Sequence, residues 1–240
     1  TVVLDAQGQS RVSMEDYVGV YLLIESIKGD DDRVDIDPLP DDPISPSTSG
    51  DPYVYQGGFI IEKETSTTRL PDAGGYFHPI IRTSDNWVYT DPEPPFMTQA
   101  QKTYVKAVVD RFHKVIYNQA GFPRNDPQRG YPAILDVMSF IDYELMQELT
   151  NNNDGYYSSV FMHLNTDNRL AMGPVWDFNI ALGNHNGTFG SPTGWQAIRT
   201  WPWWTQLFGD ADFYQGAVDR WGDLRSGMLS VDAMMQDIDD

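Results

Sequence analysis

The spacing of the apolar residues changes near Pro95, and this change constrains the fold more than any other feature of the sequence. Before it, short runs of β-branched and aromatic residues alternate with Gly, Pro and Asp, which is typical of strands and turns. After it, apolar residues recur every three or four positions, which is typical of amphipathic helices. The sequence therefore predicts an α+β protein, with a β-rich lobe over residues 1–95 and a mainly helical lobe over 96–240.

In the first lobe, residues 17–27 (YVGVYLLIESI) are apolar and long enough to predict a buried strand. Residues 29–52 are rich in Asp and Pro and are expected to form a surface loop. Four shorter segments are expected to be strands: 53–55, 59–61, 76–83 and 87–89.

Four helices are expected in the second lobe. The first begins with a capping box of Thr98 and Gln101 and stops near Gly121. The second extends from about Pro132, a good first-turn residue, to Thr150. The third covers 210–225, and the fourth begins at Ser230. A strand-like segment, 157–164, is expected between the second and third helices.

The chain is strongly acidic: 35 Asp and Glu residues outnumber 16 Lys and Arg, and the formal net charge is −19. Such a field repels duplex nucleic acid and anionic membrane surfaces, so neither is an expected partner. No segment reaches the ~18 consecutive apolar residues of a membrane helix, so membrane insertion is not expected. Cysteine is absent, which excludes disulfides and thiolate metal sites. A bound nucleotide would need metal ions and a local basic pocket.

Two acids stand apart from the surface aspartates. Asp154 follows three asparagines at the end of the second expected helix, and Asp177 lies in the apolar sequence GPVWDFNIALGN. A carboxylate that loses its water is costly unless something compensates it. Asp177 therefore pairs with a base, caps a turn or holds a metal ion, and the local sequence leaves these three alternatives open.

The order of elements around these acids is similar to the catalytic core of protein kinases. There, a helix is followed by a loop Asp that orients the attacking hydroxyl, then by a hairpin and a second Asp that binds Mg²⁺. Asp154 and Asp177 lie on either side of a segment expected to contain a short hairpin. Spacing alone is weak support, because Asp154 could simply close a helix.

Longer segments resemble the CotH kinase family, the spore-coat-protein-H type of atypical protein kinase. Residues 134–165 (ILDVMSFIDYELMQELTNNNDGYYSSVFMHLN) and 170–184 (LAMGPVWDFNIALGN) carry much of the likeness. Residues 17–36 (YVGVYLLIESIKGDDDRVDI), 57–64 (GGFIIEKE) and 203–230 are similar to further blocks of the family. The resemblance implies an atypical kinase fold. Family members usually have an extra strand segment at the start and more helix at the end, so the chain is expected to be a domain cut at both ends.

The resemblance implies an ATP-dependent protein kinase that phosphorylates Ser or Thr of a protein substrate. It implies that Asp154 is the catalytic-loop acid and that Asp177, with Asn179, binds Mg²⁺ or Mn²⁺. Many members carry a second Asp where this chain has Asn179, and typical kinases place an Asn where it has Ser159. An amide holds a hard cation less strongly than a carboxylate, so the first departure weakens the expected metal site.

Glu25 and Lys28 lie at the end of the first long strand, and the resemblance puts this pair in the family's matching block, followed by Arg33. A Lys that holds phosphates and a Glu that orients it are what such a site requires. The competing interpretation is an exposed ion pair at a strand end, worth under ~1 kcal/mol. Lys63, flanked by two glutamates, is a further candidate for nucleotide binding, and a solvated charge cluster is its competing interpretation.

Two other classes of function stay open. One is a non-catalytic, pseudokinase-like surface or adhesion module of a larger secreted bacterial protein, which the resemblance permits. The other is an extracellular module stabilised by Ca²⁺ at the acidic loop 30–42, although that loop lacks the EF-hand order. The aromatic run 201–204 is expected in the core rather than at a sugar-binding surface. The four histidines show no zinc-site spacing: His78, His113, His163 and His185.

Overall fold

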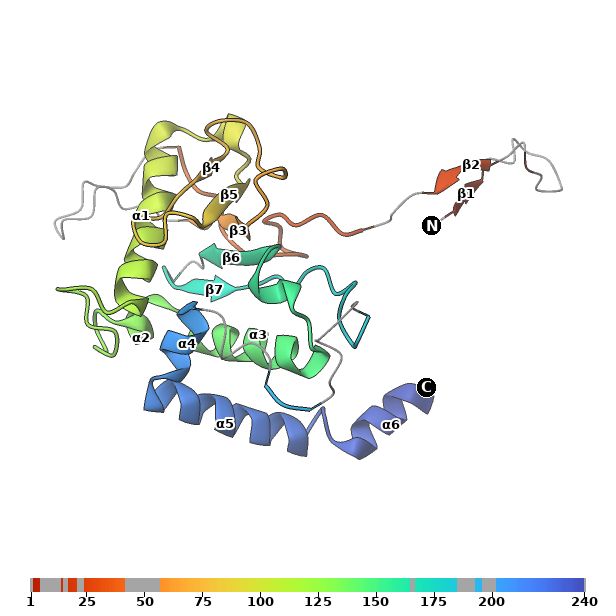
Figure 1. Cartoon of the computed structure of the whole chain (residues 1–240). Coiled ribbons are helices and arrows are strands. Elements are labelled where there is room, and N and C mark those ends of the chain that lie inside the picture. Colours follow the sequence, from red (N-terminus) through yellow and green to blue (C-terminus); the bar gives the residue numbers. More distant parts are fainter. Residues whose placement is uncertain are drawn as a thin grey trace.

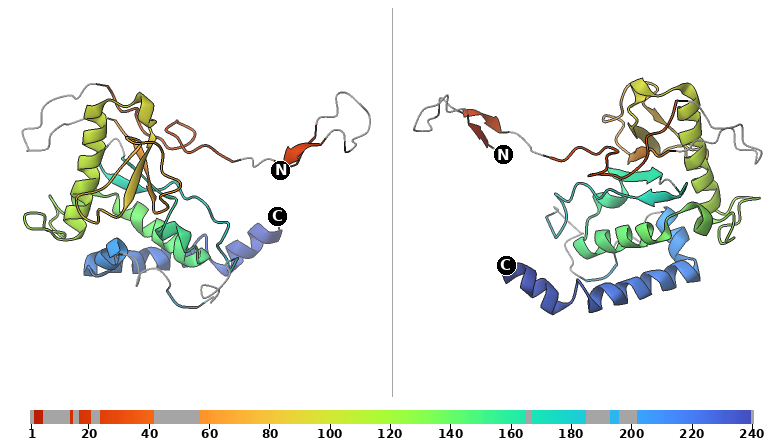
Figure 2. Two further views of the ribbon diagram at one scale, coloured as in Figure 1. Left: turned by 45° about the horizontal axis from the view of Figure 1, so that its top comes forward. Right: turned by 180° about the vertical axis from the view of Figure 1, so that it is seen from behind.

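The computed structural model describes residues 2–4, 14, 17–20, 24–41, 57–164, 167–184, 193–195 and 202–239. These residues form a five-stranded antiparallel sheet and several helices, so the predicted α+β class is confirmed (Figure 1). A separate hairpin of β1 (Val2–Leu4) and β2 (Tyr17–Val20) stands away from this body, as both views of Figure 2 show. No helix in the described part of the chain is long and apolar enough to span a bilayer.

The sheet joins strands from both halves of the sequence, in the order β4-β5-β3-β6-β7. The central strand β3 (Ile60–Glu64) pairs with β5 (Asn86–Asp91) on one side and with β6 (Val160–Leu164) on the other. The edges are β4 (Tyr76–Phe77) and β7 (Leu170–Met172). Because β3 lies antiparallel to β6, the end of β3 lies beside the residues that precede β6.

Helix α1 (Gln99–Ile116) starts at Thr98 and has the capping box expected from the sequence. Helix α3 (Val137–Thr150) lies beside β7, and α5 (Ala211–Ser226) packs on the far side of α3 (Figure 1). The other helices are α2 (Tyr131–Ile134), α4 (Pro202–Phe208) and α6 (Val231–Asp239), with short 3-10 turns η2 (Pro94–Phe96) and η3 (Asp154–Tyr156). The aromatic run at α4 is in the core, as expected: Trp203 and Trp204 are both buried.

The two faces of the sheet meet different parts of the chain, because successive residues of a strand point to opposite sides. The face that includes Ile61 joins the main core, to which α1, α3 and α4 contribute. The opposite face carries a smaller cluster of Val34, Ile60 and Phe161, which we call the second cluster. Its covering layer is the irregular segment 24–41, which reaches the sheet through a bridge between Pro38 and Gly58.

Two predicted strands are shorter than expected. Of the strand predicted over 17–27, residues 17–20 form β2, residues 21–23 lie outside the described residues, and residues 24–27 are not in a strand. The strand predicted over 76–83 ends at Phe77, two residues before Pro79, which cannot donate to a ladder. The strand predicted at 53–55 and the loop residues 42–52 lie outside the described residues.

The helix predicted from Pro132 to Thr150 is in fact two helices. Leu135 is extended (φ −113°, ψ 145°), and the Asp136 amide donates to the Leu170 carbonyl at 3.0 Å. The Asp136 carboxylate then accepts from the Ser139 amide and caps α3. The chain thus leaves the helix to bond to the sheet edge, and this interruption places the start of α3 against β7.

Candidate active site

Asp154 lies on the loop that follows α3. The helix ends at Asn151, whose left-handed backbone (φ 53°) turns the chain, and Asp154 begins the short turn η3. The amides of Tyr157 and Ser158 both donate to the Asp154 carbonyl, at 2.9 and 3.2 Å. These bonds close a compact loop over residues 154–159, which we call the Asp154 loop, and the Asp154 side chain is half-buried on it.

Asp177 lies on the segment that leaves β7, and its backbone also adopts a left-handed conformation (φ 60°). This conformation is uncommon for a residue other than Gly and concentrates at functional sites. The Asn152 side-chain amide donates to the Asp177 carbonyl at 3.4 Å, and the Leu182 amide donates to the Thr150 carbonyl at 2.6 Å. These two bonds place the segment of Asp177 directly beside the loop of Asp154.

A pocket of about 300 Å³ lies between the segment 25–34 and residues 174–176. Glu25 and Arg33 line one wall, and Trp176 lines the other. The Arg33 guanidinium is 2.5 Å from the Glu25 carboxylate. The Trp176 ring packs edge-on against Phe161 of the second cluster, with ring centres 6.2 Å apart. Two of the predicted cofactor residues thus line one pocket with the residue that precedes Asp177, although Asp177 itself does not line it.

Lys28 lies on the same segment but does not line this pocket. Its ammonium is 3.0 Å from the Asp30 carboxylate, and both side chains are largely exposed. The Lys28 ammonium and a backbone amide bond lower the pKa of the Asp30 carboxyl. Lys28 is therefore already paired within its own turn.

Lys63 lies on the other side of β3 from the pocket. It shares the face of Ile61 and pairs with Val160, whereas Ile60 and Phe161 face the pocket side. Its side chain is buried, and its ammonium donates to the Tyr157 carbonyl at 2.9 Å. The prediction that Lys63 belongs to a solvated charge cluster is wrong, because β3 directs this side chain into the core.

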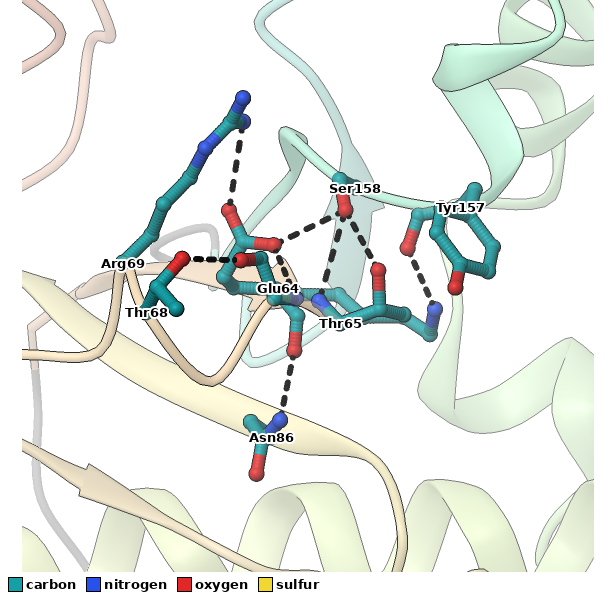
Figure 3. A network of polar contacts seen from close by, with 9 residues as sticks. Glu64, Thr65, Thr68, Arg69, Asn86, Tyr157 and Ser158 are labelled. Carbon is teal, nitrogen blue, oxygen red and sulfur yellow. Dashed lines mark hydrogen bonds and ion pairs between the residues drawn. The ribbon is translucent and has the colours of Figure 1, made fainter.

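Glu64 and Ser158 form a buried polar contact between β3 and the Asp154 loop (Figure 3). The Ser158 hydroxyl donates to the Glu64 carboxylate at 2.9 Å and lies 2.6 Å from the Thr65 hydroxyl. Arg69 approaches the other carboxylate oxygen at 3.7 Å, and Asn86 donates to the Glu64 carbonyl at 3.0 Å. Consecutive residues of β3, 63 and 64, therefore hold consecutive residues of the loop, 157 and 158.

The family model for CotH kinase proteins matches residues 3–240. The chain belongs to the CotH kinase family. No curated protein and no solved structure matches the chain. Membership associates the chain with kinase-like phosphotransferases, and it confirms the family suggested by the sequence motifs.

The two positions at which this CotH kinase chain departs from kinase patterns have distinct surroundings. Ser159 is nearly buried and has a left-handed backbone (φ 55°), a conformation that Asn adopts more readily than Ser. Asn179 is exposed, and its carbonyl accepts a bond from the Asn184 side chain at 2.6 Å. The Asn179 side chain is therefore open to solvent two residues from Asp177.

The donor atoms at this place suit a hard cation. Asp177 and Asn179 offer only oxygen ligands, and Mg²⁺ commonly uses one or two carboxylates together with phosphate oxygens and water. Within the described ranges no group of three or more His, Cys, Asp or Glu residues could hold a metal ion unaided. A metal ion held by Asp177 and Asn179 would need its remaining oxygen ligands from water or from a bound phosphate.

The described histidines and the described part of the acidic loop 30–42 do not contribute to the candidate site around Asp154 and Asp177. The Nδ1 atoms of His78, His113 and His163 donate to backbone carbonyls at 2.8–3.1 Å, and His185 lies outside the described residues. In the loop predicted to bind Ca²⁺, Asp30 pairs with Lys28, and residue 42 lies outside the described part.

A second set of contacts, made by side chains of α3, also holds the Asp154 loop. The sequence did not indicate these contacts. The Tyr143 hydroxyl of α3 donates to the Gly155 carbonyl at 2.7 Å. A Cβ on Gly155 would lie 2.1 Å from Gln147 Oε1, so a larger residue here would require the buried Gln147 side chain to move. Glu144, on the same side of α3, is fully buried, and burial raises the pKa of its carboxyl to about 8. Tyr156 packs beside it and is also buried.

Proposed function

We propose that the chain is an ATP-dependent phosphotransferase whose reaction takes place between Asp154, Asp177 and the pocket of Arg33 and Trp176. The observation that supports it most directly is the bond from the Asn152 amide to the Asp177 carbonyl. This bond holds side by side the two segments whose acids have the order and spacing of a kinase catalytic core. Membership of the CotH kinase family agrees with the proposal.

Each residue has a separate part in the proposed reaction. Asp154 accepts a hydrogen bond from the acceptor hydroxyl, orients it toward the terminal phosphate and takes its proton as the new P–O bond forms. In the same step the bond from the terminal phosphorus to the β,γ-bridging oxygen breaks, and ADP leaves with that oxygen. Asp177 and Asn179 would hold Mg²⁺ or Mn²⁺, which neutralises phosphate charge when bound. Arg33, released from Glu25, binds phosphate oxygens, because a guanidinium matches their geometry. Lys28 adds a second positive charge to the same segment.

The acceptor in this proposal is a Ser or Thr hydroxyl of a protein, as in the protein kinases of this type. The support is that Asp154 stays partly exposed, although most of its loop is buried. A carboxylate placed there meets a hydroxyl presented by a large substrate, and the acceptor needs no deep pocket of its own.

The proposal is tested by the free energy of unfolding with ATP, with Mg²⁺, with both and with neither. A ligand at 100 times its dissociation constant adds about 2.7 kcal/mol. The gain should require both components and should disappear in Asp177→Ala. The matched control is Asp219→Ala, an Asp on the exposed side of α5, which should keep the gain.

Transfer is then measured with γ-labelled ATP and Ser- and Thr-containing peptides. Asp154→Ala should retain the stabilisation by ATP and Mg²⁺ but lose transfer. Transfer at the wild-type rate in Asp154→Ala would refute the role of this carboxylate.

The second candidate function is a non-catalytic binding module with the same fold. One observation favours it: both cations assigned to the phosphates already face carboxylates, Arg33 to Glu25 at 2.5 Å and Lys28 to Asp30 at 3.0 Å. A well-folded chain that gains no stability from ATP and Mg²⁺ in any combination would support this candidate.

A further inference from the structure

Lys63 is a buried cation in a place where an apolar side chain would cost less. It is only 5 % exposed, and its ammonium lies 5.9 Å from the centre of the Tyr157 ring and 6.0 Å from that of Trp203. Burying an ammonium is unfavourable unless hydrogen bonds and the π electrons of nearby aromatic rings compensate for the lost hydration. The packing of β3 alone therefore does not explain why a Lys occupies this position.

A hydrogen bond joins Lys63 to the loop that carries Asp154. Its ammonium donates to the Tyr157 carbonyl at 2.9 Å, three residues after Asp154. The next residue of the strand, Glu64, accepts from the next residue of the loop, Ser158 (Figure 3). Hydrogen bonds with an ammonium or a carboxylate as one partner are about twice as strong as neutral ones, so both attachments are of the stronger kind.

We propose that Lys63 is a positioning residue: its ammonium fixes the backbone at Tyr157 and thereby the place of the Asp154 loop. Lys63 acts through the loop and touches no nucleotide, because its side chain lies on the face of β3 opposite the pocket of Arg33 and Trp176. The consequence for catalysis rests on the proposed phosphotransferase function, whereas the placement of the loop does not.

The charge of Lys63 is kept at a cost to the folded chain. Burial lowers the pKa of Lys63 from 10.5 to about 8, against the attraction of Asp85 and Glu64, while Arg82 also lowers it. The folded chain therefore binds this proton less tightly than the unfolded chain, and the contribution of this group to the free energy of unfolding rises as pH rises through about 8. The positioning role rests on the bond to the Tyr157 carbonyl and not on this titration.

The first test is amide hydrogen exchange of the whole chain, followed by mass spectrometry of peptides that cover 154–160. Lys63→Met, which keeps the length and apolar volume of the side chain, should lower protection of this loop by about 10- to 100-fold, the loss of one charged hydrogen bond. The matched control is Gln101→Met. Gln101 is equally buried and donates to the Leu39 and Pro40 carbonyls at 3.2 and 2.9 Å, far from the loop.

Unchanged protection of residues 154–160 in Lys63→Met, or an equal loss of protection there in Gln101→Met, would overturn the proposal, whatever the chain catalyses.

The catalytic consequence is read from kcat and KM. Lys63→Met should lower kcat by about tenfold or more and leave the KM for ATP within about twofold, because it displaces Asp154 and leaves the pocket intact. An inactive wild type with an intact exchange result would refute the proposed function and keep the positioning role. A loss confined to KM would refute the assignment and indicate direct contact with the nucleotide.

Discussion

Replacement of Glu144 by Gln should stabilise the chain at alkaline pH and have little effect at acidic pH. Glu144 is fully buried on α3, and the pKa of its carboxyl is raised from 4.5 to about 8. Burial is the main cause, the negative charge of Glu148 adds to it, and the Tyr156 hydroxyl partly opposes it. At neutral pH the folded chain therefore keeps this side chain mostly protonated, whereas the unfolded chain does not.

The size of the effect follows from this difference in pKa. Because the folded-state pKa lies above the unfolded one, the folded state binds the proton more tightly. The resulting stability is fully present below about pH 4.5 and is lost as pH rises through about 8. Between pH 5 and pH 8.5 the wild type should lose about 4 kcal/mol from this group alone, at 1.36 kcal/mol per unit of pKa. Gln has a similar shape and no charge to bury, so Glu144→Gln avoids this loss.

Urea unfolding of both chains at pH 5, 7 and 8.5 measures the prediction. The difference between variant and wild type removes the contributions of other groups, such as Glu62 and Lys63, that also titrate in this range. The control is Glu93→Gln, an exposed Glu, which should change the free energy of unfolding by less than about 0.5 kcal/mol at every pH. A difference between Glu144→Gln and wild type that stays constant with pH would refute the reasoning.

Further predictions concern single contacts, each measured by urea unfolding at pH 7. Gly155→Ala should destabilise the chain by about 1–3 kcal/mol, because the new methyl would lie 2.1 Å from Gln147 Oε1. Gly222→Ala, with nothing within 4 Å, should instead stabilise α5 by roughly 0.5–1 kcal/mol, and equal effects of these two changes would contradict the assignment. Asp210→Ala should cost about 2–4 kcal/mol, because Asp210 caps α5 and accepts from the buried Tyr131 hydroxyl at 2.7 Å. A cost below about 1 kcal/mol would show that the cap and the buried bond are not both formed.

Local signals in the sequence predicted the helices well. The pair Thr98 and Gln101 predicted the start of α1 correctly, because a capping box depends on residues three positions apart. Its end was less predictable: α1 stops at Ile116, before Gly121, where Asn118 adopts the left-handed conformation. The break at Leu135 was missed because its cause is a bond to Leu170, 34 residues away.

The candidate site was predictable only in part for the same reason. The sequence motifs singled out Asp154 and Asp177. Because successive residues of a strand point to opposite faces, a strand at 59–64 also directs Lys63 away from Glu62 and Glu64. No local pattern tells which face of the strand meets the core, so the direction of Lys63 was not predictable. The contact of Glu64 with Ser158 joins residues 94 positions apart and depends on β3 pairing with β6.

The segment that covers the second cluster has few buried side chains, and this has a consequence for partial unfolding. In residues 24–36, only Val34 is fully buried against the sheet, and Ile27 and Ile36 are partly buried. At about 1.5–3 kcal/mol per fully buried side chain, this attachment is weaker than the 5–15 kcal/mol typical of a whole domain. The segment should therefore detach and reattach many times for each global unfolding event. The segment carries Glu25 and Arg33. A ligand that contacts both Arg33 and Trp176 would bind only the attached form of the segment and would therefore stabilise that form.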